Sequence, residues 1–281
     1  MANKDLIEEI RGTRVSSHDL AVFWLWQNSF ILKTPKGTLI AIDPYFSHSV
    51  NKYEDPNTEY VYSDLPMRPE EVLVDYVFCT HDHLDHADPE TLPVIAKNSP
   101  KTKFLGTPEC YAHFLKLGIP EDRAASLDVN ITVKLADFKV TPIYSIPEET
   151  IKQWEKKSGH RMTTHYGYIF DFNYAKVYNM GDSSPEVAKE PMKVLKDIVP
   201  FSPEIAMLPV IGDFPDRKPE DARVFAKLMR AKIVIPSHYG CFKKRTIDPQ
   251  LFVNLFRDDV GVRPIIIEHK GKYIYNAIAC S

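Results

Sequence analysis

The segment 79-CTHDHLDHAD-88 follows the apolar run 72-VLVDYV-77 after Phe78, and its six residues from His81 to His86 hold three of the chain's ten histidines and two aspartates. Imidazole and carboxylate groups are the ligands that zinc-like ions prefer. A turn after a buried strand can bring such groups to one point, because the sheet fixes its backbone. We therefore expect a metal site here, rather than a polar turn that happens to be rich in histidine.

The spacing within this segment suggests two ions. His81 and His83 alternate and can point the same way, whereas Asp85 and His86 follow on the next turn and can face a second ion. A second ion needs ligands from other strand ends, and the sequence offers two. The strand 177-VYNMG-181 leads to Asp182, and 233-IVIPSHYG-240 carries His238. Three strand ends that carry His or Asp predict a dinuclear site.

The rest of the chain alternates strands with helices, and residues 47–71 form a long polar loop of the kind that is often functional. A final hairpin is expected to turn at Gly271, between strands at 264–270 and 272–278. Two blocks of strands, each with helices, predict an α/β fold with four α/β/β/α layers in one domain, residues 1–281, with 1–18 as an N-terminal extension. Other strands are expected at 20–26, 29–34, 38–43, 74–80, 102–106, 131–146, 167–172, 175–182, 204–210 and 232–238, and proline-started helices at Pro89, Pro108, Pro185, Pro219 and Pro249.

Composition narrows the function classes. The formal net charge is −3, which gives no electrostatic reason to expect a nucleic-acid or membrane partner. The apolar run 20-LAVFWLW-26 ends at Gln27 and Asn28, far short of the ~20 residues that span a bilayer. We see no signal peptide in the sequence. The four cysteines are scattered and form no CxxC pair, so we expect reduced thiols and not a disulfide framework. We expect a cytoplasmic protein that acts on a small molecule.

The pattern HxHxDH after a hydrophobic strand, followed in order by strand-GD and strand-PxH, resembles the metallo-β-lactamase superfamily. This resemblance implies a four-layer αββα sandwich with the site at one edge of its two sheets. It also implies two divalent ions, zinc by default. His81 and His83 would hold one ion, the second would be held by Asp85, His86 and His238, and Asp182 would bridge the two.

The third histidine of the first metal is open. His165, in 163-TTHYGYIF-170, precedes a strand and is the first candidate, and His160 is the second. The superfamily often places this ligand at the preceding strand end, which is 142-PIYSIPEE-149 here and has no histidine. If His165 is an ordinary strand-edge residue, a water molecule, Glu148 or nothing completes that metal.

Within the superfamily the chain is similar to the L-ascorbate-6-phosphate lactonase branch from about residue 20 to 275. The similar segments include FLGTPECYAHFLKLGIPEDR, YxMGDS and the stretch 225-FAKLMRAKIVIPSHYG-240. Two positions depart from the pattern: Ser184 follows GDS where the lactonase is expected to have histidine, and IPSHY replaces IPFHH. Both departures lie beside the expected metal ligands, so the substrate can differ from that of the lactonase. The branch also suggests manganese as an alternative ion and a homo-oligomer.

Further residues are candidates for substrate handling. Lys243 and Arg245 follow His238 and could hold a phosphate, although a solvated basic face is the alternative. Ser184 is a further substrate-contact candidate. Tyr239, like Asp85, could relay a proton to a leaving alkoxide. Asp43, in 41-AIDPYF-46, resembles a superfamily position that supports a ligand histidine through a hydrogen bond.

The expected function is a metal-dependent hydrolase in which a metal-bridging hydroxide opens a lactone, with Asp85, Asp182 and Tyr239 as catalytic residues. The alternatives are a phosphodiesterase that resembles the N-acyl-phosphatidylethanolamine phospholipase D branch, and a metal-free relative without activity. A nuclease is disfavoured by the acidic balance, and a β-lactamase by the lack of an export signal.

Overall fold

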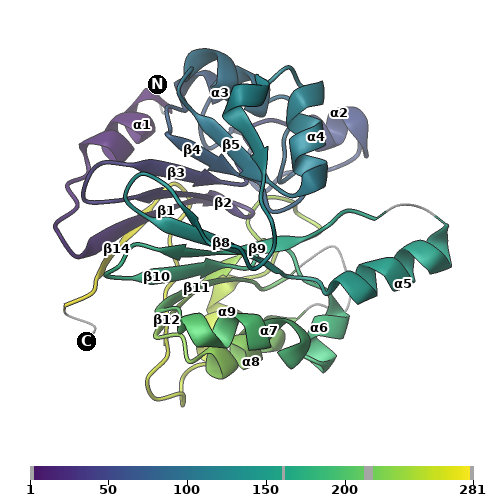
Figure 1. Ribbon diagram of the computed structural model, residues 1–281. Coiled ribbons are helices and arrows are strands. Elements are labelled where there is room, and N and C mark those ends of the chain that lie inside the picture. The colour runs from purple at the N-terminus through teal and green to yellow at the C-terminus, as the bar shows by residue number, and fades with distance from the viewer. Residues whose placement is uncertain (1–2, 160–161, 212–217, 279–281) are drawn as a thin grey trace. The chain divides into compact units, whose positions relative to one another are not determined.

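The computed structural model describes residues 3–159, 162–211 and 218–278 (Figure 1). By the contacts between Cα atoms, the chain divides into two compact units. Unit 1 contains Met1–Ser126, Gly240–Lys244 and Ile267–Ser281, and unit 2 contains Leu127–Tyr239 and Arg245–Ile266. Within the described residues, each unit has one mixed β-sheet and its own helices.

The sheet of unit 1 has the strand order β14-β1-β2-β3-β4-β5-β6. From β14 to β3 neighbouring strands are antiparallel, and from β3 to β6 they are parallel. The carboxyl ends of β3 and β4 therefore lie side by side, which matters for the site. The bounds are β1 Asp19–Trp26, β2 Ser29–Lys33, β3 Leu39–Ile42, β4 Tyr76–Phe78, β5 Lys103–Gly106, β6 Ala124–Ser126 and β14 Lys272–Asn276.

Helices of unit 1 bury an apolar face against this sheet. Alternate side chains of β1, including Phe23 and Leu25, share one core with Ile10 of α1 and Phe114 of α4. The N-terminal segment is thus more than an extension, because α1 contributes to that core. The helices are α1 Asn3–Gly12, α2 Ser49–Tyr53, α3 Leu92–Asn98 and α4 Pro108–Lys116, with short 3₁₀ turns at Pro69–Glu71 and Glu121–Arg123.

The sheet of unit 2 has the order β13-β12-β11-β10-β9-β8-β7, parallel from β13 to β10 and antiparallel from β10 to β7. Helix α7 packs on β8, and helix α8 packs on β11. Figure 1 shows both helices below this sheet. The strands are β7 Val133–Lys134, β8 Lys139–Tyr144, β9 Tyr166–Asp171, β10 Lys176–Asn179, β11 Ile205–Pro209, β12 Ile233–Ser237 and β13 Arg263–Pro264. The helices are α5 Glu148–Ser158, α6 Pro185–Lys189, α7 Met192–Ile198, α8 Pro219–Met229 and α9 Pro249–Asn254, with a 3₁₀ turn at Val199–Phe201.

Most predicted strands and four of the five proline-started helices occur where expected. The prediction of a final hairpin at Gly271 was wrong: β13 pairs in parallel with β12, whereas β14 pairs with β1. The first proline-started helix begins at Leu92 and not at Pro89. None of the described helices has the length and apolarity required of a membrane span.

Candidate metal centre

The His-rich segment follows β4 as a compact turn. The backbone N–H groups of His86 and Ala87 both donate to the carbonyl of His83, at 3.0 and 2.8 Å. The turn starts next to Asp43, which follows β3, because β3 and β4 run parallel and end at the same edge of the sheet. The Asp43 N–H donates to the carbonyl of Phe78 at 2.8 Å, so the two strand ends are joined directly.

The fully buried carboxylate of Asp43 organises this turn. Its Oδ1 accepts from the backbone N–H of Thr80 at 2.7 Å. Its Oδ2 accepts from the Thr80 hydroxyl and from Nδ1 of His86, both at 2.7 Å. A carboxylate is acceptor-only, so His86 carries its proton on Nδ1 in the latter contact. The predicted supporting role of Asp43 thus has a defined geometry.

Thr80 extends this control to a second histidine. Its Oγ1 lies 3.1 Å from Nδ1 of His81, and its hydroxyl hydrogen is already donated to Asp43. Towards His81 the oxygen must therefore accept, which places a proton on Nδ1 of His81 as well. Both histidines then present Nε2 as the atom with an available lone pair. Metal-bound histidines typically have this arrangement, with the other nitrogen bonded to a fixed acceptor, so the residues fit a metal ion.

Two neighbouring side chains in the β1–β2 turn support the site and were not predicted from the sequence. Nε2 of Gln27 donates to Oδ2 of Asp85, and Nδ2 of Asn28 donates to Oδ2 of Asp43, each at 2.7 Å. Both side chains are fully buried. In the sequence, these two residues are visible only as a polar pair between two apolar strands. That pattern does not indicate which residues they contact.

In unit 2, β10 and β12 each pair in parallel with β11, so their carboxyl ends lie at the same edge. Asp182 follows Gly181, whose φ of +61° suits glycine. Oδ1 of Asp182 lies 2.7 Å from Nε2 of His238, and both residues are buried. Nδ1 of His238 contacts the carbonyl of Ile211 at 2.9 Å, so it carries the proton and Nε2 faces the carboxylate.

His165 directly precedes β9 and is buried, and its carbonyl accepts from the N–H of Ser145 at 3.0 Å. The alternatives fare differently. His160 lies outside the described residues. Glu148 begins α5, where it is exposed and pairs with Lys152 at 2.6 Å.

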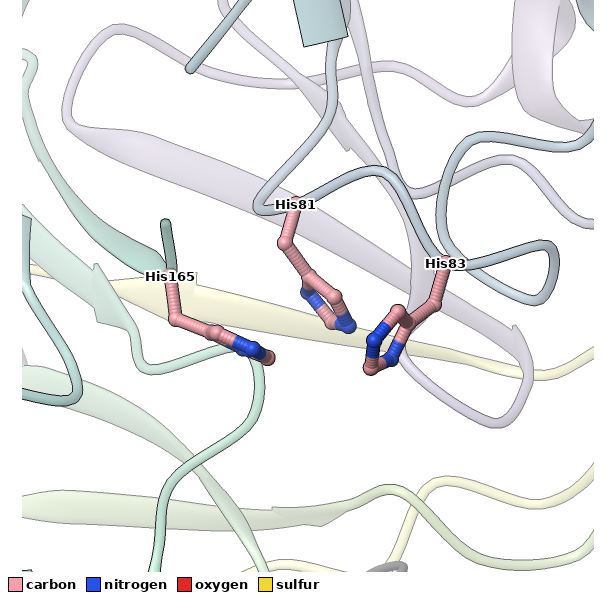
Figure 2. Close-up of side chains that lie close together, drawn as sticks. All are labelled: His81, His83 and His165. Carbon is pink, nitrogen blue, oxygen red and sulfur yellow. The ribbon is translucent and has the colours of Figure 1, made fainter. Parts of the chain in front are cut away.

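Three groups of described side chains have the composition and spacing for a metal ion, because in each group one ligand atom per residue lies within 4.8 Å of the others. Figure 2 draws the first group, with the ring centroids of His81 and His83 4.5 Å apart at an interplanar angle of 78°. All seven predicted ligands occur in these groups. The groups are His81, His83 and His165; His81, His86 and Asp182; and Asp85, His86 and His238.

The predicted substrate residues lie outside the three groups of candidate metal ligands. Ser184 is fully buried at the N-cap of α6, and Tyr239 is buried after His238. The exposed ammonium group of Lys243 lies 3.6 Å from the carboxylate of Glu59, and Arg245 is half-buried. None of these four belongs to the metal-binding groups found among the described residues.

The 47–71 loop reaches the His-rich turn through a small aromatic cluster. Tyr60 forms an antiparallel bridge with Phe242, and its hydroxyl lies 2.7 Å from that of Tyr45. Leu84, inside the HxHxDH turn, packs against this cluster. Burial raises the pKa of both phenols, and the negative charge of Asp85 raises them further, so they stay protonated at neutral pH.

Comparison with known proteins identifies the family of the chain. Residues 21–238 match the model of the β-lactamase superfamily domain. A UPF0173 metal-dependent hydrolase of Koribacter versatilis is 30% identical over 230 residues, which are 82% of this chain and 88% of that protein. Among solved structures, the metallo hydrolase Igni18 of Ignicoccus hospitalis has a TM-score of 0.64 at 20% identity, covering 92% of this chain and 98% of that one. An isothiocyanate hydrolase from Delia radicum gut bacteria reaches 0.66 at 16%, covering 92% and 99%.

These comparisons confirm the predicted fold class. Both sheets are mixed and flanked by helices, as in the α/β sandwich of this superfamily, and a single family model spans residues of both units.

Proposed function

The chain belongs to the metallo-β-lactamase superfamily, among the UPF0173 metal-dependent hydrolases, and from this premise we propose that it opens a lactone by metal-assisted hydrolysis. The proposed substrate is a small sugar lactone of the L-ascorbate 6-phosphate type. The observation that carries the proposal is the pair of histidines, His81 and His86, whose Nδ1 protons are fixed through Asp43 and Thr80. Histidines fixed in this tautomer are suited to hold divalent ions for hydrolysis.

Two ions, Zn²⁺ or Mn²⁺, would be held by the three groups of ligands. His81, His83 and His165 would hold the first, and Asp85, His86 and His238 would hold the second. Asp182, which groups with His81 of the first set and His86 of the second, is assigned to both. When bound, such ions supply a hydroxide near neutral pH and stabilise the negative charge that develops on the carbonyl oxygen when the carbonyl carbon is attacked.

The protein side chains contribute position and protons. Asp43 holds His86, and through Thr80 also His81, in one tautomer, so each of these two presents the same nitrogen throughout the reaction. The alkoxide that leaves a lactone needs a proton, and we assign its relay to Asp85 or Tyr239. Both are nearly fully buried, so the proton comes from a defined group and not from bulk water.

A phosphate on the substrate would be bound by Arg245 and Lys243. The contact of Lys243 with Glu59 does not prevent this, because an exposed ion pair at 3.6 Å contributes at most about 1 kcal/mol and a doubly charged phosphate competes well with one carboxylate.

The test compares chelator-stripped protein with protein reloaded with Mn²⁺ or Zn²⁺, using L-ascorbate 6-phosphate and a chromogenic phosphodiester in parallel. Ring opening that requires metal supports the proposal and identifies the ion. Diester cleavage without ring opening would assign the site to phosphodiester hydrolysis. Metal-loaded protein that does neither would exclude both substrates, and protein that takes up no metal would be a non-enzymatic relative.

Asp182→Ala is the matching variant. We expect it to lose metal and activity together while the protein still folds, because it removes the carboxylate that groups with His81 and His86 and that we assign to both ions. The control is Asp258→Ala, which changes an exposed aspartate beyond α9 and should retain full activity. Full activity of Asp182→Ala would contradict the shared role.

A further inference from the structure

Gln27 combines two features that are unfavourable by themselves. Its φ of +48° lies in the left-handed region, where a residue with a Cβ is destabilised by about 1–2 kcal/mol. Its amide side chain is also fully buried, which is costly unless the amide is hydrogen-bonded. Asn or Gly would adopt this backbone more easily in a turn between two antiparallel strands. The backbone of the turn therefore does not explain why a glutamine occupies it.

The contacts of Gln27 explain the choice. Its Nε2 donates to Oδ2 of Asp85 at 2.7 Å, across 58 positions of sequence, and an asparagine side chain is one methylene too short to make the same contact. The main chain is held in place as well, because the carbonyl of Gln27 accepts from Nε1 of Trp24 at 3.1 Å. The glutamine is thus a donor on a fixed backbone, aimed at one carboxylate.

A neutral donor has a specific effect on a carboxylate ligand. It fixes one oxygen and so restricts rotation about the Cβ–Cγ bond of Asp85, without adding a positive charge that would repel a cation. His86, beside it, is oriented separately, through its own bond to Asp43. The support for Asp85 can therefore be removed without disturbing the support for the histidines.

We propose that Gln27 is a positioning residue that sets the affinity of the metal position served by Asp85, and that it leaves the position of His81 and His83 unchanged. The inference rests on the ligand assignment of the proposed function. Removal of a hydrogen bond to a metal ligand typically weakens binding about 10–100-fold, so we expect a loss of that size in one of two binding steps.

Gln27→Asn tests this most sharply. Asparagine loses the contact with Asp85 but suits the left-handed backbone better, which offsets part of the cost of the lost hydrogen bond, so the metal-free variant should still fold and unfold cooperatively. Stepwise Zn²⁺ and Co²⁺ titration against a chromophoric chelator measures both binding steps. We expect the step of the Asp85 position to weaken about 10–100-fold and the other to stay the same. Gln250→Met, on the exposed face of α9, is the control and should titrate like the wild type.

A double-mutant cycle shows whether the effect passes through Asp85. Gln27→Met keeps the side-chain length without the donor and should repeat the loss of Gln27→Asn. In an Asp85→Ala background, which has no side-chain oxygen to accept from Gln27, Gln27→Met should cause no further loss. Wild-type affinity in both Gln27 variants, or equal losses in the two backgrounds, would overturn the inference. Wild-type protein that binds one ion or none would instead refute the proposed two-ion site, so the two failures are distinguishable.

Discussion

At the scale of single residues, the site depends on hydrogen bonds that fix protons. The Asp43 carboxylate accepts from the side chains of Asn28, Thr80 and His86, and the Thr80 hydroxyl passes its influence on to His81. One buried acid thus controls the tautomer of two candidate ligands. Thr80 is the link, since it is the donor to Asp43 and the acceptor from His81.

This role of Thr80 predicts that one substitution weakens metal binding and a second one does not. Thr80→Val removes the hydroxyl while keeping the shape, so His81 loses its acceptor, and we expect metal affinity to fall about 10–100-fold. Thr80→Ser keeps the hydroxyl and should retain affinity within a few-fold. Competition with a chelator of known affinity measures both. Equal affinity in the two variants would show that the hydroxyl does not orient His81.

At the scale of elements, β1 is held against the segment that follows β12 by a close contact between Trp24 and Gly240. A Cβ on Gly240 would lie 2.7 Å from Cη2 of Trp24, and the φ of Gly240 is +71°. This glycine is therefore required twice, for its backbone conformation and for the space that its missing side chain leaves to the indole ring.

Gly240→Ala should consequently destabilise the protein by about 2–5 kcal/mol, from about 1–2 for the backbone and about 1–3 for overpacking. Gly37→Ala separates the two effects, because Gly37 also has positive φ (+87°) but has open space around its Cβ position. It should cost only the backbone part. Urea unfolding of the metal-free proteins measures both, and equal losses would mean that Trp24 moves aside freely.

His269 connects the 47–71 loop to the approach to β14. Its ring stacks on Tyr62, with centroids 3.8 Å apart and planes 9° apart, and it meets Trp24 edge-on at 6.3 Å. Burial, with a smaller effect of Lys270, lowers the pKa of His269 from 6.5 to about 4. The folded protein thus favours the neutral ring.

The sign of the pH effect follows from linkage. Between about pH 6.5 and 4 the unfolded chain binds more protons at this position than the folded one, so stability falls as the pH falls through this window and is unaffected above it. His269→Phe keeps an aromatic ring and should make the decline shallower in metal-free protein. His18→Phe, at an exposed position, should leave it unchanged. Unfolding temperatures measured from pH 4 to 7 test this prediction. If the pH dependence of the unfolding temperature is the same in His269→Phe as in the wild type, other groups cause the decline.

At the scale of the whole molecule, the candidate ligands span residues 81 to 238 and come from the ends of several strands. Ions that need ligands from such distant positions of the sequence bind the folded chain and not the unfolded one. Binding of that kind stabilises the fold by mass action, by about 2.7 kcal/mol when the free ion is at 100 times its dissociation constant.

We therefore expect Zn²⁺ or Mn²⁺ at this excess to raise the unfolding temperature of chelator-stripped protein by roughly 5–10 °C, given about 2–4 °C per kcal/mol for chains of this size. Differential scanning calorimetry measures the shift. Asp182→Ala should show a smaller one. If tightly bound metal left the unfolding temperature unchanged, the ligands would have to be equally available in the unfolded chain.

Local patterns in the sequence were sufficient to locate most of the strands and the candidate ligands. Both follow from local patterns: apolar runs define the strands, and His81 to His86, Asp182 and His238 stand directly after such runs. Whether these residues bind metal stays a prediction for the titrations above. The family comparison confirmed the fold class that the same pattern predicted.

The groups that support the candidate ligands, and the partners of the last strands, could be identified only in the folded chain. Gln27 and Asp85 are 58 positions apart and Asn28 and Asp43 are 15 apart, so their hydrogen bonds depend on how strands pack and not on any local spacing. Likewise, 264–270 and 272–278 have the pattern of a hairpin, yet β13 and β14 pair with β12 and β1. A strand pattern shows that a segment needs a hydrogen-bonded neighbour, and only the packed chain determines which neighbour is there.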